Sequence, residues 1–184
     1  PGEHNVKNAL AVIAVASLFS LPMSLVAETL HEFRGVHRRY ELTSVTDGVR
    51  VYQDYGHNPT ETRNVLHVAR IQAPQKLWAV LQPHTYSRTK ALFDGFLTCF
   101  DEADEVLVTD ICGAREVDPG DINSGMLVDA MVKKGIHAHL TPSFDDAEAY
   151  LRAHWQPGDV VVTLGCGDID LLNEQIARNG DTHK

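Results

Sequence analysis

The chain has 184 residues, of which 43% are hydrophobic, and its formal net charge is -9 at pH 7. That length suffices for one well-buried domain with residues to spare. The acidic charge and the lack of a long Lys/Arg cluster argue against a surface that binds a nucleic-acid backbone or anionic lipid. Cys99, Cys112 and Cys166 lack the spacing of a zinc or redox motif, so they fit packed thiols in a reducing compartment.

The first thirty residues predict two helices rather than a membrane span. The apolar stretch 9–30 is interrupted by Pro22 and contains Glu28 and several serines. We expect helices over 5–19 and from about residue 22 onward, each with one apolar stripe. The stripes consist of Ala9, Val12, Ala16 and Phe19, and of Met23, Val26 and Leu30. Each stripe needs a partner surface, and pairing of two copies into a homo-oligomer is one alternative.

The rest of the chain predicts an α/β domain. Two β-rich runs, 40–45 and 49–53, flank Asp47-Gly48, which is a hairpin signal. Strands and helices then alternate, which is typical of a mostly parallel sheet flanked by helices. We expect further strands at 77–81, 105–109, 138–140 and 160–164, helices from 59 and from about 89, helices at 124–134, 145–154 and 169–178, and a disordered tail no longer than 179–184.

The strand at 49–53 is followed by the segment Asp54-Tyr55-Gly56-His57-Asn58-Pro59-Thr60-Glu61. Asn58 is predicted to cap a helix in which Pro59 is the first residue and Glu61 the third. Asp54 and His57 then lie where a strand ends and a helix begins, which is where open α/β sheets bind ligands and where anions are stabilised. From the residues alone, a metal site and a nucleotide site fit equally well.

A second polar cluster, 82–89, follows the strand at 77–81 and should reach the same edge of the sheet. In this cluster Arg88 suits a carboxylate and His84 suits proton donation or orientation, although both residues could merely cap the next helix. The polar loop 110–121 is a candidate lid. The Gly-Cys-Gly-Asp segment 165–168 is a weak phosphate-binding signal, and close backbone packing explains its glycines at least as well.

Two further motifs admit a functional and a structural interpretation. Arg38 and Arg39 follow a glycine and suit phosphate, or they form a solvated pair. Asn5 and Asn8 lie three residues apart on one helical face, where their amides suit a base edge, although Asn5 alone reads as an N-cap. The sequence contains no Gly-x-x-x-x-Gly-Lys-Ser/Thr loop, so any nucleotide site is incomplete within it.

In order and combination these motifs resemble the Mur ligases, the ATP-dependent amide-forming enzymes of peptidoglycan synthesis. The matching segments are 2–9, 33–39, 54–61, 82–89, 114–122 and 165–169. The resemblance is strongest to the members that join L-alanine to UDP-N-acetylmuramate through an acyl phosphate. It implies a cytoplasmic enzyme that uses ATP and Mg2+ and serves cell-wall biogenesis, cell shape and cell division.

The resemblance also implies a domain organisation and a set of site residues. Residues 1–31 would be the last helices of a central ATPase domain, and residues 32–184 the whole Rossmann-like C-terminal domain. ATP would be bound by Asn5, Asn8, Arg38, Arg39 and Asp54, the amino acid by His57, His84 and Arg88, and no metal ligand falls in this chain. Without the phosphate loop, we expect the fragment alone to be inactive.

Three alternatives stay open at this point. One is the related ligase that attaches a recycled peptide to UDP-N-acetylmuramate. Another is a metal-dependent hydrolase that uses Asp54, His57 and His84. The third is a binding module without catalysis.

Overall fold

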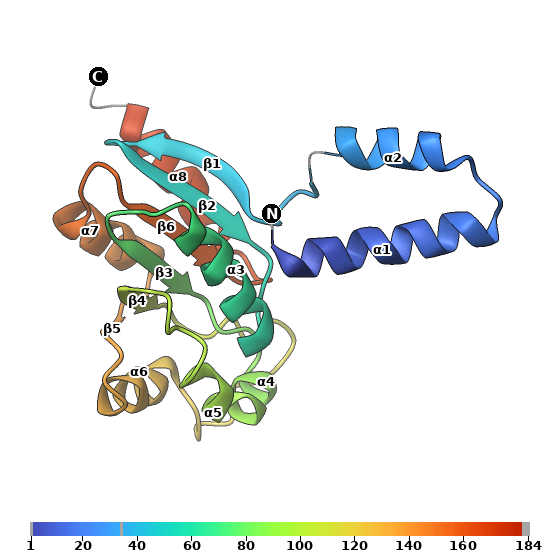
Figure 1. The fold of residues 1–184 in the computed structure, drawn as a ribbon. Helices are drawn as coiled ribbons and strands as arrows, with labels where there is room; N and C mark the ends of the chain where they lie inside the picture. The colour runs from blue at the N-terminus through green and yellow to red at the C-terminus, as the bar shows by residue number, and fades with distance from the viewer. Residues whose placement is uncertain (1, 34, 182–184) are drawn as a thin grey trace. The chain divides into compact units, whose positions relative to one another are not determined.

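The computed structural model describes residues 2–33 and 35–181, and the chain divides into two compact units, residues 1–37 and 38–184. The first unit is a helical hairpin of α1 (Glu3–Leu18) and α2 (Met23–Glu32), whose connection contains Pro22 (Figure 1). Helix α1 begins after Gly2, so Asn5 is its third residue and the N-cap interpretation of Asn5 is wrong.

The apolar stripes predicted for the first unit are mostly exposed to solvent. Among its described residues, Ala16 and Val26 are the buried hydrophobic ones, whereas Val12, Phe19 and Met23 remain exposed. The unit therefore presents a large apolar surface. In the part of the chain that the structure describes, every helix is too short or too polar to cross a membrane.

The second unit is built on a six-stranded sheet with the order β1-β2-β6-β3-β4-β5. Strands β1 and β2 pair antiparallel, and the other neighbours pair parallel, which confirms the predicted mixed sheet. The strands are β1 (Glu41–Thr46), β2 (Val49–Asp54), β3 (Leu77–Leu81), β4 (Glu105–Val108), β5 (Ala138–Leu140) and β6 (Val160–Leu164).

The hairpin between β1 and β2 turns at Asp47-Gly48, as predicted. Both residues have positive φ, 54° and 78°, which is the conformation of a type I′ turn. A Cβ on Gly48 would lie 2.9 Å from Cβ of Pro157, so this position also needs glycine for space.

The helices of the second unit follow the predicted alternation with two differences. The helix expected from about residue 89 begins at Tyr86 and stops at Ala91, and a separate short helix follows it. Residues 179–181 belong to the last helix rather than to a tail, while 182–184 lie outside the described residues. The helices are α3 (Pro59–Ile71), α4 (Tyr86–Ala91), α5 (Phe93–Phe96), α6 (Ser124–Lys133), α7 (Phe144–His154) and α8 (Asp170–Asp181).

Two hydrophobic clusters cover the two faces of the sheet (Figure 1). One cluster packs α3, α5 and α6 against the sheet, and the other packs α7 and α8. Every residue of the central strands β3 and β6 is buried, as their continuous apolar runs predict. Strand β6 lies between β2 and β3. After β3 the chain leads to α5 on one face of the sheet, whereas after β6 it leads to α8 on the other face. Such a topological switch point is where α/β sheets bind ligands.

Candidate functional site

Asp54 ends β2 and holds the loop that follows it. Its carboxylate is 3% exposed and accepts hydrogen bonds from the backbone N–H of Tyr40 at 2.8 Å and of Gly56 at 2.7 Å. Burial raises the pKa of Asp54, while these two hydrogen bonds and the charge of Arg39 act to lower that pKa. Asp54 therefore fixes the backbone at two places, before β1 at Tyr40 and after β2 at Gly56.

The start of α3 forms as predicted and orients His57. Asn58 caps the helix through Glu61 N at 3.0 Å, and the Glu61 carboxylate accepts from His57 N at 3.0 Å. The ring atom His57 Nδ1 lies 3.0 Å from the carbonyl oxygen of Tyr55. A carbonyl can only accept, so Nδ1 carries the proton and Nε2 of a neutral His57 is left as an acceptor.

His84 and Arg88 meet after the end of β3. Arg88 Nη1 lies 3.1 Å from His84 Nδ1 and 3.7 Å from Cys166 Sγ. Because a guanidinium only donates, His84 Nδ1 is the acceptor and a neutral His84 presents its proton on Nε2. Cys166 comes from the loop after β6, so this contact joins the two loops of the switch point. Sequence analysis placed Cys166 in the segment 165–168 but did not predict its contact with Arg88.

His84 lies close to the two other residues that are predicted to bind the amino acid, Arg88 and His57. Burial, then the charge of Arg88, then that of His57 lower the pKa of His84, while Glu116 raises it. Arg88 contacts His84 directly, and His57 is close enough for its charge to act on His84, at the carboxyl edge of the sheet. A histidine with a lowered pKa is neutral near pH 7.

The loop between β4 and α6, which the sequence offered as a candidate lid, is hydrogen-bonded to the segment 85–90. Thr85 N donates to the carbonyl of Cys112 at 2.8 Å. Further along the loop, the carboxylate of Glu116 accepts from both the backbone N–H and the hydroxyl of Ser87. Lys90 then forms an ion pair with Asp121. Sequence reasoning placed Glu116 in a matching motif but gave it no role.

The two arginines predicted for phosphate have different surroundings. The guanidinium of Arg38 donates to the carbonyls of Gly167 at 2.9 Å and Gly165 at 3.3 Å, and its side chain is 17% exposed. The Arg39 side chain is 50% exposed, with Nη1 4.0 Å from the Glu61 carboxylate. Both guanidinium groups lie over the Tyr55 ring, at 5.1 and 5.5 Å from its centroid. Arg38 thus ties loops together, and Arg39 is the more available cation.

The Gly-Cys-Gly segment after β6 is a close-packing feature. A Cβ on Gly167 would lie 2.5 Å from Oε1 of Gln82 and 2.9 Å from Sγ of Cys112, so a larger residue does not fit there. Gln82 Nε2 also donates to Asp168 at 2.7 Å, which links the loops after β3 and β6.

Asn5 and Asn8 lie in the first turns of α1, in the other unit, and both are exposed. Their spacing of three residues puts the two amides on one face of that helix, as predicted.

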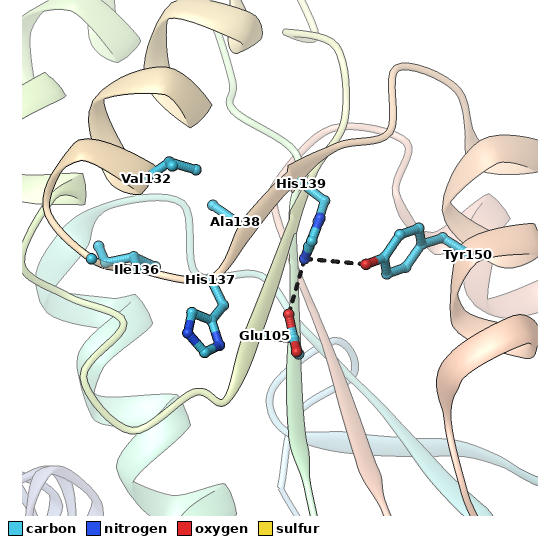
Figure 2. Close-up of a pocket in the computed structure, with 8 residues that line it drawn as sticks. Glu105, Val132, Ile136, His137, Ala138, His139 and Tyr150 are labelled. Carbon is cyan, nitrogen blue, oxygen red and sulfur yellow. Dashed lines mark hydrogen bonds and ion pairs between the residues drawn. The ribbon is translucent and has the colours of Figure 1, made fainter.

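A pocket of about 460 Å³ lies away from all these residues (Figure 2). It is found where β4 and β5 begin, at the opposite edge of the sheet from the carboxyl ends. Within it, His139 Nε2 lies 3.0 Å from the Glu105 carboxylate and 3.1 Å from the Tyr150 hydroxyl (Figure 2). These polar groups pair with one another, and the pocket shares no residue with the predicted site.

The residues named for a metal-dependent hydrolase do not converge on one point. The Asp54 carboxylate is directed to the backbone amides of Tyr40 and Gly56, and His57 Nδ1 is directed to a backbone carbonyl. Among the described residues there is no group of three His, Cys, Asp or Glu side chains placed to share a metal ion.

Several relatives of similar sequence carry the same name. A UDP-N-acetylmuramate--L-alanine ligase of Caldanaerobacter subterraneus subsp. tengcongensis is 42% identical over 175 residues, which is 95% of this chain and 38% of that protein. The ligase of the same name from Acetivibrio thermocellus is 37% identical over 179 residues, 97% of this chain and 38% of the relative. The chain thus spans about two fifths of the length of these relatives.

Solved structures agree with the sequence comparison. The UDP-N-acetylmuramate-alanine ligase MurC of Thermotoga maritima matches all of this chain and 39% of its own, with a TM-score of 0.80 and 30% identity. A murein peptide ligase of Psychrobacter arcticus matches with a TM-score of 0.72 over 96% of this chain and 36% of its own. At 24% identity, this structural match shows a shared fold alone.

The family model described as "Mur ligase, glutamate ligase domain" matches residues 38–167. This range contains the whole sheet, the loops that carry His57, His84 and Glu116, and Arg88 in α4. Sequence motifs, sheet topology and family model therefore agree, and the chain belongs to the Mur ligase family.

Proposed function

We propose that the chain is the C-terminal part of an ATP-dependent ligase that joins L-alanine to UDP-N-acetylmuramate in the cytoplasmic stage of peptidoglycan synthesis. The observation that supports this most directly is the convergence of His57, His84 and Arg88 at the switch point of the sheet. The Arg88 cation suits the carboxylate of an amino acid, and the two imidazoles offer partners for its amino group.

The amino acid is held through its carboxylate and its amino group. Arg88 uses Nη1 on His84 and Cys166, and we assign its remaining donors, Nη2 and Nε, to the carboxylate. His57 Nε2 is the acceptor that we assign to the amino group, since Nδ1 is directed to Tyr55. Holding the amine in its neutral, oriented form prepares it to attack an activated carboxyl carbon.

The residues that we assign to the nucleotide follow from the family resemblance. We assign Arg39 to the phosphates, Asp54 to the ribose, and Asn5 with Asn8 to the adenine. Arg38 supports them through its bonds to the loop after β6. ATP supplies the phosphoryl group that activates the lactyl carboxylate as an acyl phosphate, which the amine displaces to form the amide. The described residues do not fit a magnesium site, so we assign no step in this chain to Mg2+.

We further propose that residues 1–31 complete a central ATPase domain and that 32–184 form the domain that admits the amino acid. The sequence contains no phosphate loop, and the relatives are more than twice as long as the chain. The 184-residue chain by itself is then expected to be inactive.

An assay of ADP release tests this proposal. The complete gene product should release ADP only when UDP-N-acetylmuramate and L-alanine are both present, and the 184-residue chain should release none. Replacing L-alanine by the recycled peptide, the substrate of the related ligase, should abolish the reaction. Turnover with the peptide but not with L-alanine would instead identify the peptide ligase, and alanine-dependent turnover by the 184-residue chain would refute the division of labour.

A second assay tests the role of Arg88. In the complete enzyme Arg88→Ala should raise KM for L-alanine by about tenfold or more, because a charge-assisted hydrogen bond is lost, and should leave KM for ATP unchanged. Lys90→Ala, two residues further along α4, is the matched control and should change neither constant. An Arg88→Ala enzyme with an unchanged KM for L-alanine would contradict the assignment.

A further inference from the structure

Glu116 reaches the first turn of α4 from the loop between β4 and α6. One carboxylate oxygen accepts from Ser87 N at 2.8 Å, and the other accepts from the Ser87 hydroxyl. Ser87 directly precedes Arg88 and follows His84 by three residues. The contact therefore falls between the two residues assigned to the amino acid.

The backbone at this point is strained and needs support. Thr85 has φ 63° and ψ 141°, a conformation that residues other than glycine rarely adopt. The cap that Thr85 itself gives to α4 is weak, since its hydroxyl lies 3.4 Å from Arg88 N. The two bonds to Glu116 involve a carboxylate, which makes them stronger than neutral hydrogen bonds. Two contacts from the same loop, Glu116 to Ser87 and the carbonyl of Cys112 to Thr85 N at 2.8 Å, thus hold this turn.

We propose that Glu116 is a positioning residue of the amino-acid site, which acts through Ser87 to fix the relative places of His84 and Arg88. This inference rests on the proposed function, because the two positioned residues are those assigned to the amino acid. Glu116 touches no substrate in this scheme. Its loss should therefore weaken binding of the amino acid and leave the adenine side unaffected.

The charge of Glu116 supplies a readout that a purely structural contact would lack. Among the groups acting on His84, Arg88 and His57 lower its pKa and Glu116 raises it. Two thiols also lie in this region: Cys166 faces Arg88, and Cys112 acts on Cys166, whose pKa is raised chiefly by burial. Removing the Glu116 charge thus has a defined sign: the pKa of His84 should fall further.

The first test is an NMR titration of the histidine rings in the 184-residue chain. Glu116→Gln keeps the side-chain length and one acceptor, and it should lower the pKa of His84 and shift the Ser87 amide resonance. Asp118→Asn is the matched control, because Asp118 is exposed in the same loop and bonds only to Gly120 N in the described contacts. It should change neither signal. Equal results for the two variants would overturn the proposal.

The second test uses the complete ligase and separates this proposal from the proposed function. Glu116→Ala should raise KM for L-alanine by about tenfold, with KM for ATP unchanged, and Glu116→Gln should fall between it and wild type. A fall in kcat with an unchanged KM for L-alanine would overturn the positioning role. If the wild-type enzyme shows no alanine-dependent ADP release, the proposed function fails, while the titration still decides whether Glu116 sets the geometry around His84.

Discussion

Neighbouring residues of the same type take different roles in this chain, and Arg38 and Arg39 show why sequence alone does not separate them. The sequence correctly marks both as cations beside a glycine turn. The distinction depends on carbonyls of Gly165 and Gly167, which lie 127 and 129 residues further along the chain. The same holds for Cys166 and Glu116, whose partners Arg88 and Ser87 lie in α4, far away along the chain. Side-chain roles that depend on distant contacts are thus visible only in the folded structure.

Asp159 gives a testable case at the residue scale. Its buried carboxylate accepts from Lys76 N and Trp78 Nε1 at 3.0 Å and from Gln156 N at 2.9 Å. Asp159→Ala leaves these donors without a partner, so we expect the free energy of unfolding to fall by about 3 kcal/mol or more in urea titration. Asp118→Ala, at an exposed position, should change it by less than about 0.5 kcal/mol. Similar values for the two variants would show that the three bonds contribute little.

Elements with local signals are the ones that the sequence predicted well. The cap at Asn58 forms as expected, and Ser143 forms a full capping box with Asp146 at the start of α7. Helix α4 begins three residues earlier than expected because Thr85, in its unusual conformation, is the N-cap. That conformation is maintained by the neighbouring loop, so no local propensity predicts it.

The cap of α3 links element stability to the site. Asn58→Ala removes the bond to Glu61 N and should lower the free energy of unfolding by about 1 kcal/mol, measured by urea denaturation. Glu61 also accepts from His57 N, so the His57 amide resonance should shift as well. Asn58→Asp keeps a capping oxygen and should retain most of the stability. If Asn58→Asp loses as much as Asn58→Ala, the cap bond is not the cause.

At the scale of the whole molecule, the alternation of elements predicted the fold class but not the order of strands. Insertion of β6 between β2 and β3 is a long-range pairing, in which Val161 lies opposite Val51 on one side and Trp78 on the other. This insertion brings the loops of three strands together and creates the switch point. The sequence places the polar clusters at strand ends, and the topology brings the ends of β2, β6 and β3 side by side.

The two units differ in how much apolar surface they bury, and this difference predicts their protection from hydrogen exchange. The second unit has a hydrophobic cluster on each face of its sheet, whereas Ala16 and Val26 are the buried hydrophobic residues among the described part of the first. Isolated helices of this length are marginal in water. We therefore expect amides of α1 and α2 to exchange by local opening, and those of β3 and β6 only on global unfolding.

Hydrogen exchange followed by mass spectrometry measures this, with α8 as the matched control because it is a helix of similar length that packs on the sheet. Peptides from 3–18 and 23–32 should exchange at least about a hundredfold faster than those from 170–181, a difference in opening free energy of about 3 kcal/mol. Equal protection at low protein concentration would contradict the prediction. Protection of α1 and α2 that rises with concentration would instead show that two copies cover their apolar stripes, the homo-oligomer left open by the sequence.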